Sequence, residues 1–269
     1  MSTSPFTPID HRLQPDISGS ALVLPSISIG NIPQLTIDLL IHTYSLTKIG
    51  YLDGLYLYPF ASPIDYVNLP SKQGISHAVE VYYSPKLNIT VVQQRSPIIP
   101  TYSSTFVHQV IVPFITTNRF ESVFVLNSSD AGLVESVNSG DIKLYDTEDL
   151  ITSNLENLSL TSPSLQDSSD PNDKGNDNNS KFVTELVKAI ISQNGESKSK
   201  PINVKVIVSY VYEGDNFYDA EKSATRLQEA LKLKEQEGRT VTKWVKPVSW
   251  LGAYGDKSIP NAMEEGIFG

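Results

Sequence analysis

Cysteine is absent from this chain of 269 residues, which excludes disulfide bonds, thiolate zinc sites and cysteine nucleophiles. Long apolar runs are absent too, because none approaches the ~18 residues that a membrane-spanning helix needs. The N-terminal residues lack the basic and apolar regions of a secretory signal. From these absences we expect a soluble, intracellular protein that does not bind membranes.

Basic residues are fewer than acidic ones, with 21 Lys and Arg against 30 Asp and Glu. The formal net charge is −9 and the pI is about 4.9. Nucleic acids and anionic membranes attract clustered positive charge, so this balance argues against either as the main partner. It is compatible with a protein partner that carries basic pockets.

Known catalytic motifs are missing as well. The sequence contains no phosphate-binding loop, no Gly-x-Gly-x-x-Gly, no Gly-x-Ser-x-Gly and no His-Glu-x-x-His. Its histidines are His11, His42, His77 and His108, and none has a second metal-type ligand three or four positions away on one expected helix face. We therefore predict no catalytic residue, no cofactor and no metal site.

Apolar patterning alternates between strands and helices. Strands are expected at residues 21–24, 54–58, 78–83, 89–93, 122–126 and 202–212, and helices at 31–47, 101–117, 182–191 and 220–233. The opening order of strand, buried helix and strand favours a parallel βαβ unit. Pro113 should kink or break the second helix. The chain is therefore an α/β protein.

Composition divides the chain into parts. Residues 1–19, rich in Pro, Ser and Thr, are expected to form a flexible arm, and residues 20–255 a single α/β domain. Residues 128–180 are interpreted as a low-complexity insertion within that domain, because Ser, Asn and Asp dominate its second half. Residues 256–269 are expected to form a flexible docking tail.

Polar residues follow two of the expected strands, where ligands bind in parallel α/β sheets. Arg95, Glu213 and Asp215 could form an anion or acid–base site of a small-molecule enzyme of phosphorylase or hydrolase type. The alternative interpretation is structural: Arg95 pairs with Glu80 or Asp65, and the stretch at 213–216 is a turn that caps a helix. We favour the structural interpretation. A third hypothesis is an adaptor that binds through its acidic insertion.

The C-terminal residues Glu264-Glu265-Gly266-Ile267-Phe268-Gly269 combine two apolar side chains with acidic groups. Such a sequence is either a frayed end or a segment that inserts into a pocket of another protein. Upstream, residues 244–255 hold both tryptophans, which are favoured at interfaces, although core packing of at least one is expected. Residues 244–250 are a candidate last strand.

Four segments resemble, in order, the proteasome assembly chaperone 2 family in its fungal form: Leu22–Leu35, Gln93–Pro97, Glu213–Asn216 and Lys246–Gly255. The resemblance implies a three-layer α/β/α fold with a largely parallel central sheet and no enzymatic activity. It further implies a heterodimer with proteasome assembly chaperone 1, which caps the α-ring of immature core particles and blocks premature binding of activators. We expect such a protein in the cytoplasm and nucleus.

The same resemblance assigns a role to the tail. C-termini in this family carry a hydrophobic–tyrosine–any-residue motif that docks between neighbouring α-subunits. The matching positions here are Ile267, Phe268 and Gly269, so these are the expected partner-binding residues. Phenylalanine replaces tyrosine at position 268, which removes a hydroxyl group and predicts weaker docking of the tail.

Overall fold

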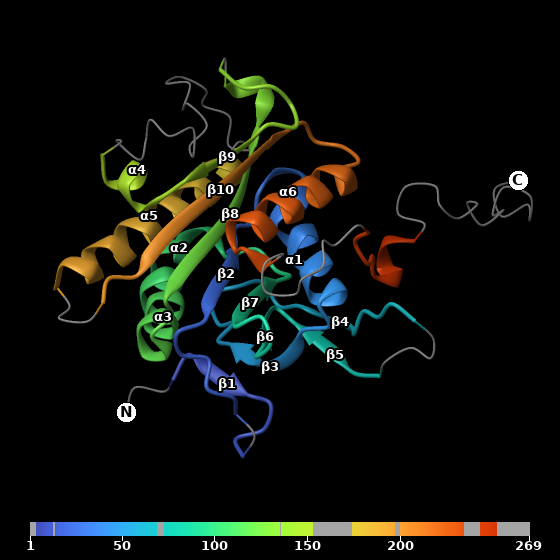
Figure 1. The fold of residues 1–269 in the computed structure, drawn as a ribbon, viewed down its shortest axis with the longest axis vertical. Helices are drawn as coiled ribbons and strands as arrows, with labels where there is room; N and C mark the ends of the chain where they lie inside the picture. The colour runs from blue at the N-terminus through green and yellow to red at the C-terminus, as the bar shows by residue number, and fades with distance from the viewer. Residues whose placement is uncertain are drawn as a thin grey trace, which may run out of the picture.

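A mixed eight-stranded sheet forms the centre of the molecule in the computed structural model, which describes residues 4–12, 14–68, 73–134, 136–152, 174–196, 200–233 and 243–251. The strand order is β1-β3-β6-β7-β2-β8-β10-β9 (Figure 1). The strands are β1 (Phe6–Pro8), β2 (Ala21–Pro25), β3 (Thr47–Leu52), β6 (Val79–Ser84), β7 (Ile89–Gln94), β8 (Ser122–Asp130), β9 (Ile142–Tyr145) and β10 (Asn203–Val211). A separate pair is formed by β4 (Ala61–Pro63) and β5 (Ile75–His77).

The helical segments alternate with these strands. They are the 3₁₀ turn η1 (Ile29–Asn31), α1 (Ile32–Thr43), η2 (Pro100–Tyr102), α2 (Ser103–Phe106), the π-helical η3 (Val107–Ile111), α3 (Val112–Asn118), η4 (Ala131–Leu133), α4 (Thr147–Thr152), α5 (Lys174–Glu196), α6 (Phe217–Ala230) and η6 (Val248–Trp250). In the described part of the chain no helix is long and apolar enough to cross a membrane.

Parallel pairing is confined to the middle of the sheet, where β2 lies between β7 and β8, and β8 continues to β10. These strands are buried on both faces, which explains their nearly continuous apolar sequence. In β2, Leu22 and Leu24 enter one core while Val23 enters the other. The outer pairs, β1–β3, β3–β6, β6–β7 and β9–β10, are antiparallel.

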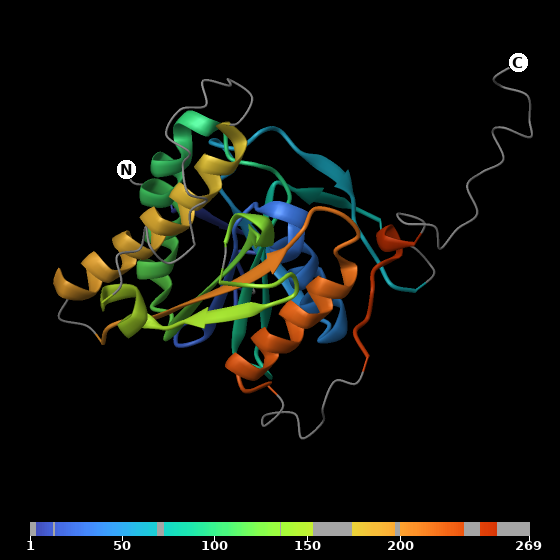
Figure 2. The same ribbon diagram turned by 90° about the horizontal axis from the view of Figure 1, so that it is seen from above.

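Helices cover both faces of the sheet and give the expected three layers (Figure 2). Helices α1 and α6 pack together on one face, where Ile37, Leu40 and Leu227 lie in a common core. The segments from α2 to α3, together with α5, cover the other face, where Phe106, Phe114 and Leu186 are buried. The three-layer α/β/α prediction is therefore confirmed, with a sheet that is parallel at its centre.

The strand expected at residues 54–58 is wrong, and so is the opening parallel βαβ unit. The strand that follows α1 is β3, which pairs antiparallel with β1 and β6. Its sequence, Thr-Lys-Ile-Gly-Tyr-Leu, hides the strand pattern because Lys48 and Gly50 interrupt it. Both are explained by long-range contacts: Lys48 pairs with Glu80 at 3.0 Å, and a Cβ at Gly50 would lie 2.4 Å from the Thr7 carbonyl oxygen.

Two proposed boundaries also differ from the structure. Within the expected arm of residues 1–19, β1 pairs with β3 and Ile17 is buried, so part of that arm belongs to the domain. Within the expected insertion of residues 128–180, β9 adds an edge strand and α4 buries Leu150. Residues 153–173 lie outside the described ranges, and α5 begins at Lys174.

Of the kink or break predicted at Pro113, the structure shows a disturbed helix and not a break. A π-helical turn, Val107–Ile111, lies between α2 and α3, and Pro113 is the second residue of α3 directly after it. The backbone stays helical across the junction, so Pro113 marks a local change of helix type where its missing N–H cannot donate to the preceding turn. The candidate strand at residues 244–250 is wrong. There, Val248–Trp250 forms a 3₁₀ turn, and both tryptophans are buried against the α1/α6 layer.

Candidate protein-interaction surface

Ile267, Phe268 and Gly269 lie outside the described residues, but the structure shows where the chain that leads to them leaves the domain. The ring of Trp250 stacks on that of Phe217, the first residue of α6, with centroids 4.4 Å apart. Val248 donates its backbone N–H to the Tyr66 carbonyl oxygen at 2.7 Å. The segment is thus fixed to the domain up to Leu251, on the side where the β4–β5 pair lies (Figure 1).

Side-chain contacts strengthen this attachment. Ser249 hydrogen-bonds through its hydroxyl to Asp65, and Lys246 forms an ion pair with Glu221 of α6 at 2.7 Å. The rings of Trp244 and Tyr44, the residue that caps the C-terminus of α1, meet edge to face with centroids 6.4 Å apart. Since α6 begins directly after β10, the chain beyond Leu251 starts near the carboxyl ends of the parallel strands.

Arg95 does not face an open site. Its guanidinium donates to both carboxylate oxygens of Asp38, at 2.9 and 2.7 Å, and the Asp38 side chain is only 5% exposed. Burial lowers the pKa of Arg95, but the Asp38 carboxylate outweighs it, so the pKa lies above its ordinary value. Arg95 is therefore structural, as expected, although its partner is Asp38 and not Glu80 or Asp65.

Glu213 and Asp215 belong to the turn that joins β10 to α6. Asp215 accepts a hydrogen bond from the backbone N–H of Phe217, and Asn216 donates its side-chain N–H to the Tyr212 carbonyl oxygen at 2.9 Å. Among the described residues no hydrogen bond or ion pair joins Arg95 to Glu213 or Asp215. The structure therefore supports the turn interpretation and does not assemble the three residues of the enzyme hypothesis.

The crevice between β2 and β8 is where a doubly wound sheet normally binds its ligand, because the chain leaves β2 toward β3 and leaves β8 toward β10, in opposite directions along the sheet. Here the protein's own polar groups occupy it. Ser26 donates to Asn127 Oδ1 at 2.7 Å, and the hydroxyls of Ser28 and Ser128 lie 2.8 Å apart. Gly30, at φ 67°, lets the η1 backbone approach Asn216 so closely that a Cβ would meet the Asn216 side chain at 2.6 Å.

A second buried polar cluster lies on β6. The Glu80 carboxylate is fully buried and pairs with Lys48 at 3.0 Å, while the Tyr82 hydroxyl donates to it at 2.7 Å. Burial, followed by the Glu80 charge, raises the pKa of Tyr82 above its ordinary value. The backbone N–H of His77 donates to the same carboxylate, so its partners are internal and the cluster is structural. Among residues in the described ranges, no three His, Asp or Glu side chains are grouped to hold a metal ion.

Exposed apolar side chains gather where β8 and β10 end. Leu133 lies in η4 after β8, Tyr212 follows the last residue of β10, and Tyr218 is the second residue of α6. All three are more than two-fifths exposed. The Tyr212 ring lies against Gly132, since a Cβ there would be 3.4 Å from the ring. The Lys222 ammonium lies 4.5 Å from the centre of the Tyr218 ring. We call Leu133, Tyr212 and Tyr218 the carboxyl-edge surface.

Sequence patterns did not identify this surface. Tyr212 continues the apolar run of β10, and it is exposed only because the strand pairing ends at Val211 opposite Asp130. Leu133 lies within residues 128–180, which composition predicts to be an insertion. The one available signal is that two tyrosines flank the polar turn at residues 213–216, an arrangement suited to interfaces because tyrosine combines an apolar ring with a polar tip.

These features define an α/β/α domain whose strand-end crevice is packed with its own side chains and whose exposed edge is apolar and aromatic. The chain belongs to the PAC2 family, whose model matches residues 22–228.

Curated relatives cover nearly the whole chain. It is 28% identical to proteasome assembly chaperone 2 of Saccharomyces cerevisiae, over 88% of this chain and 95% of that protein. It is 30% identical to proteasome assembly chaperone 2 of Xenopus laevis, over 91% and 95%, and 27% identical to the human protein of that name, over 93% and 96%. The prediction that the chain is not an enzyme is confirmed by these relatives, which are named as assembly chaperones.

Solved structures share the fold. Pyrococcus furiosus PbaA, an archaeal homolog of proteasome-assembly chaperone, aligns with a TM-score of 0.55 at 16% identity, over 87% of this chain and 88% of that one. A protein of unknown function from Thermoplasma acidophilum aligns with a TM-score of 0.51 at 10% identity, over 80% and 76%. At such low identity these similarities establish the α/β/α architecture alone.

Proposed function

We propose that this protein is a proteasome assembly chaperone. Paired with proteasome assembly chaperone 1, it binds the α-ring of core-particle precursors in the cytoplasm and nucleus, promotes their correct assembly and blocks premature binding of activators. The observation that carries the proposal is the extent of similarity: curated relatives with this name align over about nine-tenths of the chain. The packed strand-end crevice agrees with recognition by a surface and not with turnover of a small molecule.

In this proposal the tail is a second contact, not the main one. Fully burying Ile267 and Phe268 contributes roughly 1.5–3 kcal/mol each, and a carboxylate that meets a lysine adds about 1.5–3 kcal/mol. Association and ordering cost at least ~4 kcal/mol. The tail alone is therefore a weak ligand, but it becomes effective once the folded domain is bound, because its insertion is then intramolecular.

The anchoring of residues 243–251 supports a main contact made by the folded domain and a second contact made by the tail. Because Trp250 is fixed against Phe217, the tail begins at a defined point next to the first residue of α6. A tail that starts from a fixed point binds intramolecularly, and for short linkers the effective concentration is of millimolar order. We assign the main contact with a partner protein to Leu133, Tyr212 and Tyr218, which are exposed, apolar and aromatic.

The tail is tested by deleting residues 267–269. With the partner chaperone co-expressed, the shortened protein should still form the heterodimer but should release purified α-rings faster than the full chain in competition at physiological salt. The control is Lys257→Ala, which alters the tail without touching the motif. Equal retention of α-rings by the shortened and full chains would refute the tail assignment.

The domain surface is tested separately by Tyr212→Ser with Leu133→Ser. Both side chains are exposed, so folding should be preserved while co-purification of the partner chaperone or of α-subunits falls at least tenfold. The matched control is Ile151→Ser on α4, which is 61% exposed but lies away from this surface. If the double variant retained both partners at full yield, the contact would have to lie elsewhere on the domain.

A further inference from the structure

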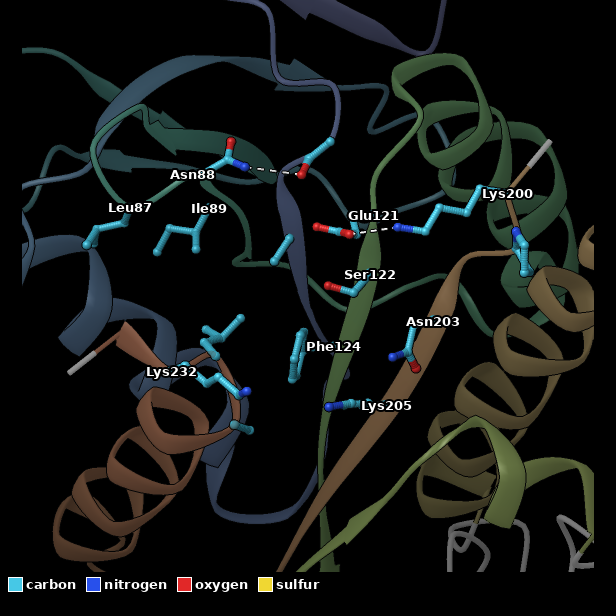
Figure 3. Close-up of a pocket in the computed structure, with 15 residues that line it drawn as sticks. Leu87, Asn88, Ile89, Glu121, Ser122, Phe124, Lys200, Asn203, Lys205 and Lys232 are labelled. Carbon is cyan, nitrogen blue, oxygen red and sulfur yellow. Dashed lines mark hydrogen bonds and ion pairs between the residues drawn. The ribbon is translucent and has the colours of Figure 1, made fainter. Parts of the chain in front are cut away.

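A cavity of about 470 Å³ opens at the opposite end of the parallel strands, where β2, β7, β8 and β10 begin (Figure 3). Its floor is apolar and includes Leu87, Ile89, Phe124 and Leu231. The last turn of α6 forms one wall. The cavity thus lies on the α1/α6 side of the sheet, at the far end of α6 from Trp250.

Three ammonium groups surround this cavity in a protein whose net charge is −9. Lys200 forms an ion pair with Glu121 at 2.8 Å. Lys205 lies 5.5 Å from the centre of the Phe124 ring. Lys232 donates its backbone N–H to the Glu229 carbonyl oxygen at 3.0 Å, while its ammonium group lines the cavity and forms no ion pair with the described residues. With one carboxylate against three cations, the cavity carries excess positive charge and suits an acidic ligand with an apolar part.

The backbone conformation of Lys232 also supports a binding role for this cavity. Lys232 follows α6 in the left-handed conformation at φ 56°, a position that normally favours glycine. A lysine there is strained, and strain of this kind at a binding site is maintained by other interactions. Asn88, on the opposite wall, is left-handed as well, at φ 49°.

We infer that this cavity binds residues 264–269 of the same chain. Glu264 and Glu265 match the excess charge of Lys205 and Lys232, and Ile267 and Phe268 match the apolar floor. The pocket then holds the tail in the free chaperone and competes with docking on a partner. It is a second site for the segment whose first site is the proposed one on the α-ring.

The connection has the right length. The described chain ends at Leu251, next to Trp250 on the first residue of α6, while the last residue of α6 lines the cavity. A helix of 14 residues spans about 21 Å. Residues 252–263 supply 12 residues, and a random-coil chain of that length has an r.m.s. end-to-end distance of about 17–21 Å. A linker whose length matches the span gives the highest effective concentration.

The absence of cysteine makes a direct test simple. In the full chain, Gly266→Cys carries a single nitroxide spin label, and relaxation enhancement is read at backbone amides in ¹⁵N spectra. We expect strong broadening at Ala21, Asn88, Asn203 and Leu231, which line the cavity. Salt at about 1 M, where the Debye length is near 3 Å, should remove most of it.

Substitutions of lysines inside and outside the cavity test whether the cavity charge holds the tail. Lys232→Gly removes a charge and relieves the left-handed strain, so the fold should be retained, and together with Lys205→Gln it should reduce the broadening at least twofold. Lys143→Gln, a lysine on β9 outside the cavity, should leave it unchanged. Absence of broadening at the cavity would overturn the inference.

The last comparison distinguishes binding within one chain from binding between two chains. Spin-labelled chain without ¹⁵N is mixed with ¹⁵N-enriched chain that carries no spin label. Broadening of equal strength in this mixture would show that the occupant comes from a second copy, and would overturn intramolecular binding. Since all these spectra are recorded without α-rings, a negative result leaves the proposed function standing. Failure of the tail deletion to affect α-ring capture would, conversely, leave this cavity assignment standing.

Discussion

The guanidinium of Arg95 and the carboxylate of Asp38 meet in a bidentate ion pair across the interface of β7 and α1, with donor–acceptor distances of 2.7 and 2.9 Å. Gln93 adds a third hydrogen bond to Asp38 at 2.8 Å. The pair is largely buried, with side-chain exposures of 21% for Arg95 and 5% for Asp38. The pair holds α1 against the sheet. Because the Arg95 guanidinium is bound to Asp38, it is not free to bind an anion at the strand ends.

Arg95→Ala should therefore destabilise the protein strongly. Removing one partner of a buried pair leaves the other charge uncompensated, which costs about 3–5 kcal/mol. Urea unfolding followed by circular dichroism measures this change. Lys200→Ala is the matched control, because the Lys200–Glu121 pair is exposed and such pairs contribute less than about 1 kcal/mol. If Arg95→Ala kept full stability, the pair would have no structural role and Arg95 would again be a candidate for ligand binding.

Gly30→Ala and Gly19→Ala form a second matched comparison. Both glycines have positive φ, 67° and 69°, so alanine at either costs roughly 1–2 kcal/mol of backbone strain. Only at Gly30 would the new Cβ collide, 2.6 Å from the Asn216 side chain, whereas nothing lies within 4 Å at Gly19. Gly30→Ala should therefore lower the free energy of unfolding by clearly more than Gly19→Ala in the same urea titration. Equal losses of unfolding free energy would mean that the Asn216 side chain moves away from the new Cβ without destabilising the protein.

Much of the architecture followed from local pattern. Strands β2, β8 and β10 were predicted because each is buried on both faces and reads as a largely apolar run, whereas β6 and β7 were predicted from alternation of apolar and polar residues. Strand β3 was missed because Lys48 and Gly50 break its apolar pattern. Their roles depend on contacts with other strands: Lys48 pairs with Glu80, and Gly50 leaves room for the Thr7 carbonyl oxygen. Local sequence carries no information about such distant partners.

The functional surface was harder to predict for the same reason. Tyr212 is exposed because β10 ends where β8 ends, which is a property of strand register and not of the residues around it. The partner of Arg95 lies 57 positions away in the sequence, on another element. The lysines around the cavity come from β10, from the residues before it and from the end of α6, so only the folded chain brings them together.

Tyr82 should make stability fall at alkaline pH. Its pKa is raised in the folded protein by burial and by Glu80, so the folded state holds the phenolic proton more tightly than the unfolded state. This contribution is complete below the unfolded value of about 10 and is lost as pH rises above it, at up to ~1.4 kcal/mol per pH unit. Tyr82→Phe should show a smaller loss of unfolding free energy between pH 8 and 11 than the parent. Parallel losses in the two proteins would contradict this assignment.

Phe268→Tyr tests the weakness ascribed to the tail. If the tail docks between α-subunits as proposed, a tyrosine hydroxyl can restore one hydrogen bond, which contributes about 0.5–1.5 kcal/mol and should slow release from α-rings by up to about tenfold. The measurement is dissociation of the heterodimer from immobilised α-rings. Ile267→Ala should act in the opposite direction by removing apolar burial. Since the hydroxyl gains nothing on an apolar floor, Phe268→Tyr should not strengthen binding to the cavity beside Lys232. A variant that left α-ring release unchanged would show that position 268 does not contact a polar partner in the complex.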